Sequence, residues 1–120
     1  MSYAPLSTAA ARDGDTLVIT CTGSAETESF DMLAAALEKA HHDALDTSCR
    51  TVVADLRGLE FASSSCLKAF VSWFHQVADL SGDARYTVRI RSNPRHAWQP
   101  RSLRALTAFA KFVEIDSEAS

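Results

Sequence analysis

The stretch VVADLRGLEFASSSCLKAF, residues 52–70, contains the change from strand to helix on which the fold of this chain depends. Residues 50–56 are a short apolar run without alternation, which is typical of a central parallel strand buried on both faces. The Arg-Gly pair at 57–58 predicts a turn after this strand. The leucine and phenylalanine of 59–61 should then carry two more apolar side chains toward the core.

The serine run after this segment should open a helix. Apolar residues recur there at steps of three and four, a spacing that indicates one buried helical face; they are Leu67, Phe70, Phe74 and Val77. We expect the helix to end near Ser81, with Gly82 as its C-terminal cap.

Upstream, the pattern predicts a hairpin and a first helix. Residues 6–11 are a weak strand candidate, and the Asp-Gly pair at 13–14 is a strong turn signal. Residues 16–22 are rich in β-branched side chains and predict a strand that Gly23 ends. Helical spacing of apolar residues then predicts a helix over 27–45.

Downstream, apolar and polar residues alternate over 86–91, which predicts a half-exposed strand with arginines on its solvent-exposed side. A third helix is expected over 98–109, and a short strand over 111–115. The ends of the chain, 1–5 and 116–120, should be frayed.

The fold class that follows is α/β. We expect one domain over residues 1–120, with a mixed sheet of four to five strands. It should combine an N-terminal hairpin with parallel β-α crossovers, and three or more helices should pack on the sheet.

The composition is that of a folded globular domain. Of the 120 residues, 47% are hydrophobic and 22% charged, and no apolar run is long enough to cross a bilayer. The N-terminus has no basic region followed by an apolar stretch, so we expect no signal peptide. Three widely spaced cysteines predict reduced thiols in the cytoplasm, without a metal site. No cofactor motif is present.

The charges are distributed unevenly along the chain. Seven of the twelve basic residues and none of the fifteen acids lie in 84–113. A solvated surface is the simpler interpretation of this segment. The alternative is a face for an anion or an acidic partner, formed by Arg89, Arg91 and Arg95. Nucleic-acid binding is not expected, because no recognisable module accompanies the arginines.

The serines at 63–65 stand out as candidates for chemistry. One serine at a helix start should cap it, which contributes about 1 kcal/mol. Three in succession exceed what a cap needs. Because a helix N-terminus favours an anion, the pattern also predicts a phosphorylation site.

At this point the chain resembles the STAS domain family, named for sulfate transporters and anti-sigma factor antagonists. The family has a strand ending in Asp, a loop with an apolar residue, and Asp-Ser-Ser-Gly opening a helix. Asp55 matches the strand Asp and Phe61 the apolar loop residue. Ser64 falls on the phosphorylated serine, Ser65 on the second serine and Leu67 on the next apolar position. The resemblance extends to LVITCTG at 17–23, SFDMLAAALEKA at 29–40 and RSLRALTAFAKFVEI at 101–115.

Similarity to the stand-alone anti-sigma factor antagonists implies a non-enzymatic regulator. Such proteins bind a switch protein kinase, or anti-sigma factor, of the GHKL type. The kinase phosphorylates the serine to release the antagonist, and a metal-dependent serine phosphatase resets it. The resemblance implies Ser64 as the switch, with Ser63 and Ser65 as alternatives. We expect the partner to contact Phe61, Ala62, Ser63, Ser65, Cys66, Lys68 and Trp73.

Two departures from the family motif support an alternative. Ser63 replaces the Asp before the phosphoserine, and Cys66 replaces the Gly after it and should narrow the space over the helix start. The chain could thus be a divergent, non-phosphorylated STAS module. It would act as a scaffold or bind a nucleotide, lipid or other anion at the helix start and the arginine-rich strand.

Other chemistry is less well supported by the residues. The serines lack the G-x-S-x-G elbow of a hydrolase, and no phosphate-binding glycine loop is present. His41 and His42 are adjacent and cannot share a helix face. Trp73 is offset from the apolar stripe of its helix, which leaves two interpretations open: an exposed docking aromatic or a cover for the core edge.

Overall fold

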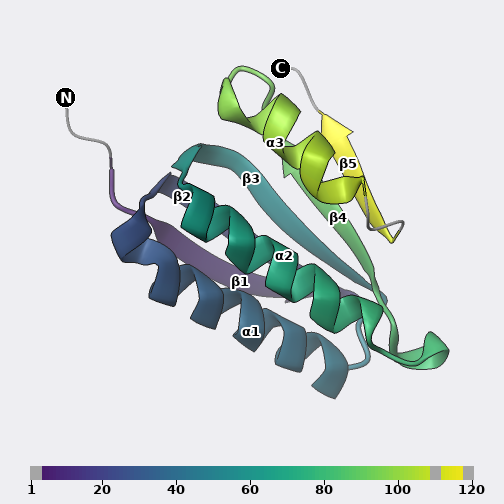
Figure 1. Ribbon diagram of the computed structural model, residues 1–120. Coiled ribbons are helices and arrows are strands. Elements are labelled where there is room, and N and C mark those ends of the chain that lie inside the picture. Colours follow the sequence, from purple (N-terminus) through teal and green to yellow (C-terminus); the bar gives the residue numbers. More distant parts are fainter. Residues whose placement is uncertain (1–3, 109–111, 118–120) are drawn as a thin grey trace.

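The chain forms a five-stranded sheet with three α-helices (Figure 1). The computed structural model describes residues 4–108 and 112–117. The elements in chain order are β1 Ser7–Asp13, β2 Thr16–Ala25, the 3₁₀ helix η1 Thr27–Ser29, α1 Phe30–Asp46, β3 Thr51–Ala62, α2 Ser64–Ala78, the 3₁₀ helix η2 Gly82–Ala84, β4 Thr87–Ser92, α3 Trp98–Thr107 and β5 Val113–Ser117.

The order of strands in the sheet follows the order in the chain. β1 and β2 pair antiparallel across a turn at Gly14, whose φ of 63° requires the freedom of glycine. β2, β3, β4 and β5 are mutually parallel, so each later strand is reached by a crossover that contains a helix. The predicted fold class, hairpin and central parallel strand are therefore confirmed.

All three helices lie on one side of the sheet (Figure 1). The hydrophobic core lies between them and the sheet, with Leu33 from α1, Phe70 from α2 and Leu103 from α3. Val53 in the middle of β3 is only 4% exposed, yet it lies outside this core cluster. Because its neighbours Val52 and Ala54 belong to the cluster, Val53 points to the opposite side of the sheet, which we call the helix-free face. None of the helices in the described ranges is long and apolar enough to span a bilayer.

The sequence suggested that Gly23 ends β2, but the strand continues to Ala25. The pairing with β3 shifts register between Gly23 and Ser24, and Gly23 has a φ of 87°. A Cβ atom at this position would collide with the carbonyl oxygen of Pro5. Glycine here thus permits a bulge and a close approach of the N-terminal segment. That segment is not frayed at Ala4, whose carbonyl accepts a 2.9 Å hydrogen bond from Ser24 N.

The predicted turn at 57–58 is also wrong, because β3 is one strand of twelve residues. Its pairing with β4 ends at Asp55, but its pairing with β2 continues with Gly58 opposite Thr22 and Ala62 opposite Ala25. Phe61 does not enter the core and is 41% exposed.

Smaller differences concern element ends. The last residue of α2 is Ala78 and its C-cap is Asp79, whereas Gly82 begins η2 and does not cap the helix. The predicted first helix begins with the separate turn η1. Residues 116–117 belong to β5 and are not frayed. Predictions for residues 1–3, 109–111 and 118–120 lie outside the described residues.

A buried chain of polar side chains crosses the core between α1, α2 and the start of β4. Trp73 Nε1 donates to Tyr86 Oη at 2.7 Å, and Tyr86 Oη lies 2.7 Å from His41 Nδ1. Indole is only a donor, so the Tyr86 hydroxyl accepts from Trp73, and its own O–H group can donate a hydrogen bond to His41 Nδ1. His41 can accept this hydrogen bond only in its neutral form with the proton on Nε2. Burial, followed by the charge of His42, lowers its pKa below the ordinary value.

This arrangement predicts that stability falls in mildly acidic solution. The unfolded chain takes up a proton at His41 as the pH falls below about 6.5, whereas the folded chain resists it. The contribution of His41 is thus complete above that pH and declines as the pH falls through the lowered pKa. Urea unfolding at pH 7.5 and 5.5 should show a loss of stability that is smaller in His41→Asn. An equal loss in wild type and variant would contradict this assignment.

Candidate functional site

The short connection from β3 to α2 places the serines. Ser63 lies between the two elements in an extended conformation, with its N–H donating 2.8 Å to Ala25 O at the end of β2. Its Oγ accepts a 3.2 Å hydrogen bond from Cys66 N, and its carbonyl accepts from Leu67 N at 2.9 Å. Ser63 therefore caps α2 and occupies the role that an aspartate side chain can also fill.

Ser64 is the first residue of α2 and the exposed member of the three, whereas Ser63 and Ser65 are half-buried. The geometry of a helix leaves the N–H groups of its first residues without intrahelical acceptors. Here the side chain and the carbonyl of Ser63 accept hydrogen bonds from the N–H groups of Cys66 and Leu67. The N–H groups of Ser64 and Ser65 remain at the positive end of the helix dipole, beside the exposed serine.

Three residues expected at the partner surface lie inside instead. Cys66 is fully buried, and its Sγ lies 3.3 Å from the carbonyl of Glu26, to which it donates. It therefore fills interior space and does not narrow the surface over the helix start. Ala62 is 7% exposed and Trp73 is 1% exposed, with the indole held by Tyr86. For Trp73 the core interpretation is the right one.

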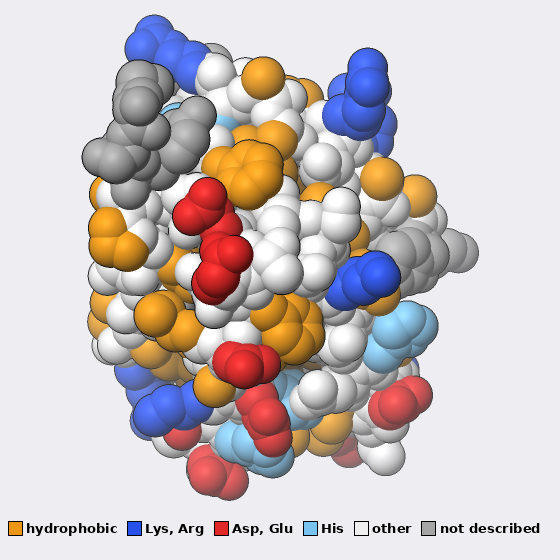
Figure 2. All heavy atoms as spheres, turned by 60° about the vertical axis from the view of Figure 1, so that its left-hand side comes forward, with side chains coloured by type: hydrophobic (Ala, Val, Ile, Leu, Met, Phe, Trp, Pro, Cys, Tyr) orange, Lys and Arg blue, Asp and Glu red, His pale blue; other side chains and the backbone are white. Residues whose placement is uncertain are grey.

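Phe61, Ser65 and Lys68 do reach the surface. Beside Ser65 and Lys68, a hollow of about 470 Å³ separates the first turn of α1 from α2, lined by Thr27, Glu28, Phe30, Asp31, Ser65, Lys68 and Ser72. Figure 2 turns the end of the molecule where α1 begins toward the viewer and shows hydrophobic side chains among acidic ones. No sequence pattern indicated Phe30 and Asp31 as site residues, because the hollow forms only where α1 packs beside α2.

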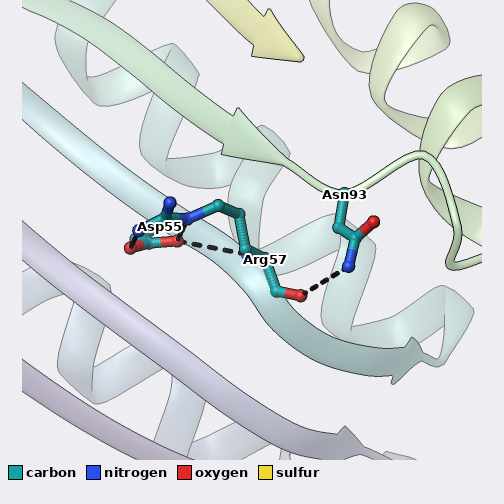
Figure 3. Close-up of polar contacts among 3 residues, drawn as sticks. All are labelled: Asp55, Arg57 and Asn93. Atoms are coloured by element: carbon teal, nitrogen blue, oxygen red, sulfur yellow. Dashed lines mark hydrogen bonds and ion pairs between the residues drawn. The ribbon is translucent and has the colours of Figure 1, made fainter. Parts of the chain in front are cut away.

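Asp55, the residue matching the strand aspartate of the family motif, holds the irregular part of β3. Its carboxylate accepts from Arg57 N at 3.2 Å, Arg57 Nε at 3.0 Å and Arg57 Nη2 at 2.8 Å (Figure 3). The side-chain hydrogen bond from Arg57 is the main reason that the pKa of Asp55 lies below its ordinary value. The ion pair lets the strand pass this point without turning.

The first turn of α3 and the loop before it supply hydrogen-bond donors to the same part of β3. Gln99 Nε2 donates to Leu56 O at 2.7 Å and Leu59 O at 3.0 Å, and Trp98 Nε1 also donates to Leu59 O at 3.0 Å. Asn93 Nδ2 lies 3.4 Å from Arg57 O, as Figure 3 shows. The fully buried Gln99 also accepts from Asn93 N at 2.7 Å. Side chains thus replace the missing strand partner.

The arginines proposed as an anion face are not gathered at the helix start. Arg89 and Arg91 alternate with the buried Val88 and Ile90, so they lie on the helix-free face, while α2 covers the other face. Arg89 Nη2 is 3.3 Å from Glu114 Oε1 on β5. Arg95 is exposed in the loop before α3. The combined site of helix start and arginine-rich strand is therefore not assembled.

Comparison with solved structures identifies the fold. One similar structure is an anti-sigma factor antagonist from Mycobacterium paratuberculosis, with a TM-score of 0.63 and 20% identity over 92% of this chain and 85% of that one. Another is the anti-sigma factor antagonist SpoIIAA in its unphosphorylated form, with a TM-score of 0.59 and 13% identity over 97% of this chain and 90% of that one. The chain has the STAS fold. Neither a protein-family model nor a curated protein matches its sequence.

The predicted resemblance is therefore confirmed at the level of the fold. In this STAS fold, Ser64 lies where a strand of the parallel sheet leads into a helix, on a surface open to solvent.

The capping geometry predicts different effects for two neighbouring serines. Ser63→Ala removes the acceptor for Cys66 N and should lower the free energy of unfolding by about 1 kcal/mol. Ser64→Ala changes an exposed first-turn residue and should stay within about 0.5 kcal/mol of wild type. Urea unfolding of both variants measures this. A larger loss for Ser64→Ala than for Ser63→Ala would show that the cap is misassigned.

Proposed function

We propose that this chain is a non-enzymatic regulatory domain that binds a partner protein and is switched by reversible phosphorylation of Ser64. The observation that carries the proposal is the exposed hydroxyl-bearing residue at the first position of α2. The likeness of the fold to anti-sigma factor antagonists supports it, as does the solved structure of SpoIIAA in a form described as unphosphorylated.

A phosphate on Ser64 suits the local electrostatics of the fold. It would add about −1.5 to −2 charges at the positive end of a helix. The N–H of Ser65 can donate to it, because the helix provides no acceptor there. Capping by Ser63 and packing by Cys66 hold α2 independently of Ser64. Phosphorylation would thus alter the surface without unfolding the helix.

The docking surface in this proposal consists of Phe61 together with Ser65, Lys68 and the hollow that these two line. Phe61 is a large apolar side chain at 41% exposure, which a partner could cover. A charged phosphate on Ser64, three residues further along the chain, would have to lose water when the partner docks. The modification should therefore disfavour a partner surface that is apolar or acidic.

The partners in this proposal are those that the STAS resemblance implies. A GHKL-type switch kinase, which is also the anti-sigma factor, would bind the unmodified chain and phosphorylate Ser64. A metal-dependent serine phosphatase would remove the phosphate. The chain itself would contribute the serine and the docking surface, and would perform no catalysis.

Affinity capture from the source cell tests the proposal. Wild type and Ser64→Ala should retain a kinase-like protein that Ser64→Glu loses, because the glutamate places a charge on the docking surface. Ser81→Glu, an exposed serine beyond the other end of α2, is the matched control and should bind like wild type.

The modification itself is read by intact mass. Wild type incubated with the captured kinase and ATP should gain one phosphate, and Ser64→Ala should gain none. The assignment of Ser64 as the switch would be contradicted if Ser64→Glu retained the kinase as well as wild type does. It would also be contradicted if Ser64→Ala gained a phosphate as wild type does.

A further inference from the structure

The outer edge of β1 is open along its whole length. β1 lies at one end of the sheet and pairs with β2 from Ser7 opposite Thr22 to Asp13 opposite Thr16. Every second residue of such an edge strand directs its N–H and C=O groups away from the sheet. Among the described residues, no further strand takes these groups, and all of β1 except the half-buried Thr8 is exposed.

β1 lacks the features that usually protect an edge strand from pairing. Lysine, proline, bulges and short length are such features. The sequence STAAARD places its charges at one end, and its register with β2 has no interruption. The opposite edge, β5, is only five residues long and carries Glu114 and Asp116. The two edges therefore differ, and β1 is the one suited to accept another strand.

The surface next to β1 is also apolar. A hollow of about 290 Å³ lies between β1 and α1, lined by Thr8, Ala9, Ala10, Ile19, Ala36, Lys39 and Ala40. One helical turn before Ala36, the side chain of Met32 is 50% exposed. The open edge of β1 thus lies beside apolar side chains of α1. A strand that pairs with this edge would cover these side chains as well as the backbone of β1.

We infer that β1 pairs antiparallel with β1 of a second copy of this chain, around a two-fold axis at Ala10. In this register Ser7 faces the second copy's Asp13, Thr8 faces its Arg12, and Ala9 faces its Ala11. No like charges meet, and all seven residues of the strand take part. The contact is self-complementary, as a two-fold interface requires. It joins two sheets into one, with the helices of both copies on the same face.

The size of the contact indicates a dimer that dissociates on dilution. A strand of seven residues and one side of α1 offer less area than the roughly 800 Å² per partner of a standard stable interface. Self-association should therefore rise with protein concentration. The Ser64 surface remains free in both states, because it belongs to the start of α2 and not to β1.

Sedimentation of the full chain over a range of concentrations tests the inference. Wild type should pass from monomer to dimer, and Ala10→Lys should remain monomeric, because it places two lysines directly opposite each other. Ala10→Glu should behave in the same way. An equimolar mixture of the two variants should regain the dimer, which excludes loss of folding as the cause. Ala105→Lys on α3 is the matched exposed control and should associate like wild type.

Amide hydrogen exchange gives an independent measurement. In wild type, alternate residues of β1 should become protected as the dimer forms. A wild type that stays monomeric up to about 1 mM would overturn the inference. So would a dimer that Ala10→Lys leaves intact, or a mixture of the two charged variants that fails to associate.

Discussion

The second half of β3 extends beyond β4, so its carbonyl groups on that side need hydrogen-bond donors that no strand among the described residues provides. The pairing of β3 with β4 ends at Asp55, seven residues before β3 itself ends at Ala62. The donors come from Trp98 and Gln99 in the first turn of α3 and from Asn93, directly after β4. A buried carbonyl without a donor costs about 1–3 kcal/mol, so these contacts keep the extension in place.

The position of the candidate site follows from this extension. Because β3 continues along β2 to Ala62, Ser63 reaches the carbonyl of Ala25 and caps α2 at the C-terminal ends of these two strands. The helix then starts at the surface, and Ser64 becomes its exposed first residue. Phe61, the last outward side chain of the extension, lies three residues before Ser64 in the sequence. The same side-chain hydrogen bonds thus determine the positions of both Ser64 and Phe61.

The sequence predicts the elements well where local periodicity decides them, and less well where distant contacts do. The apolar stripe of α2 and the serine cap are local, so both are readable. Arg57 and Gly58 look like a turn, but the strand continues through them, where Asp55 binds Arg57 and Gln99 in α3 donates to Leu56 and Leu59. The burial of Trp73 depends on a hydroxyl that Tyr86 contributes from another element. Such partners lie too far along the chain for any periodicity to indicate them.

Hydrogen exchange in Gln99→Leu tests most directly whether the extension of β3 holds the site. The substitution keeps the volume of the side chain but removes its hydrogen bonds to Leu56 and Leu59. Amide exchange over residues 59–66 should become at least about tenfold faster, which corresponds to a loss of about 1.4 kcal/mol or more in local stability. Residues 51–55, which pair with β4, should keep their protection. Unchanged exchange over residues 59–66 would contradict the account.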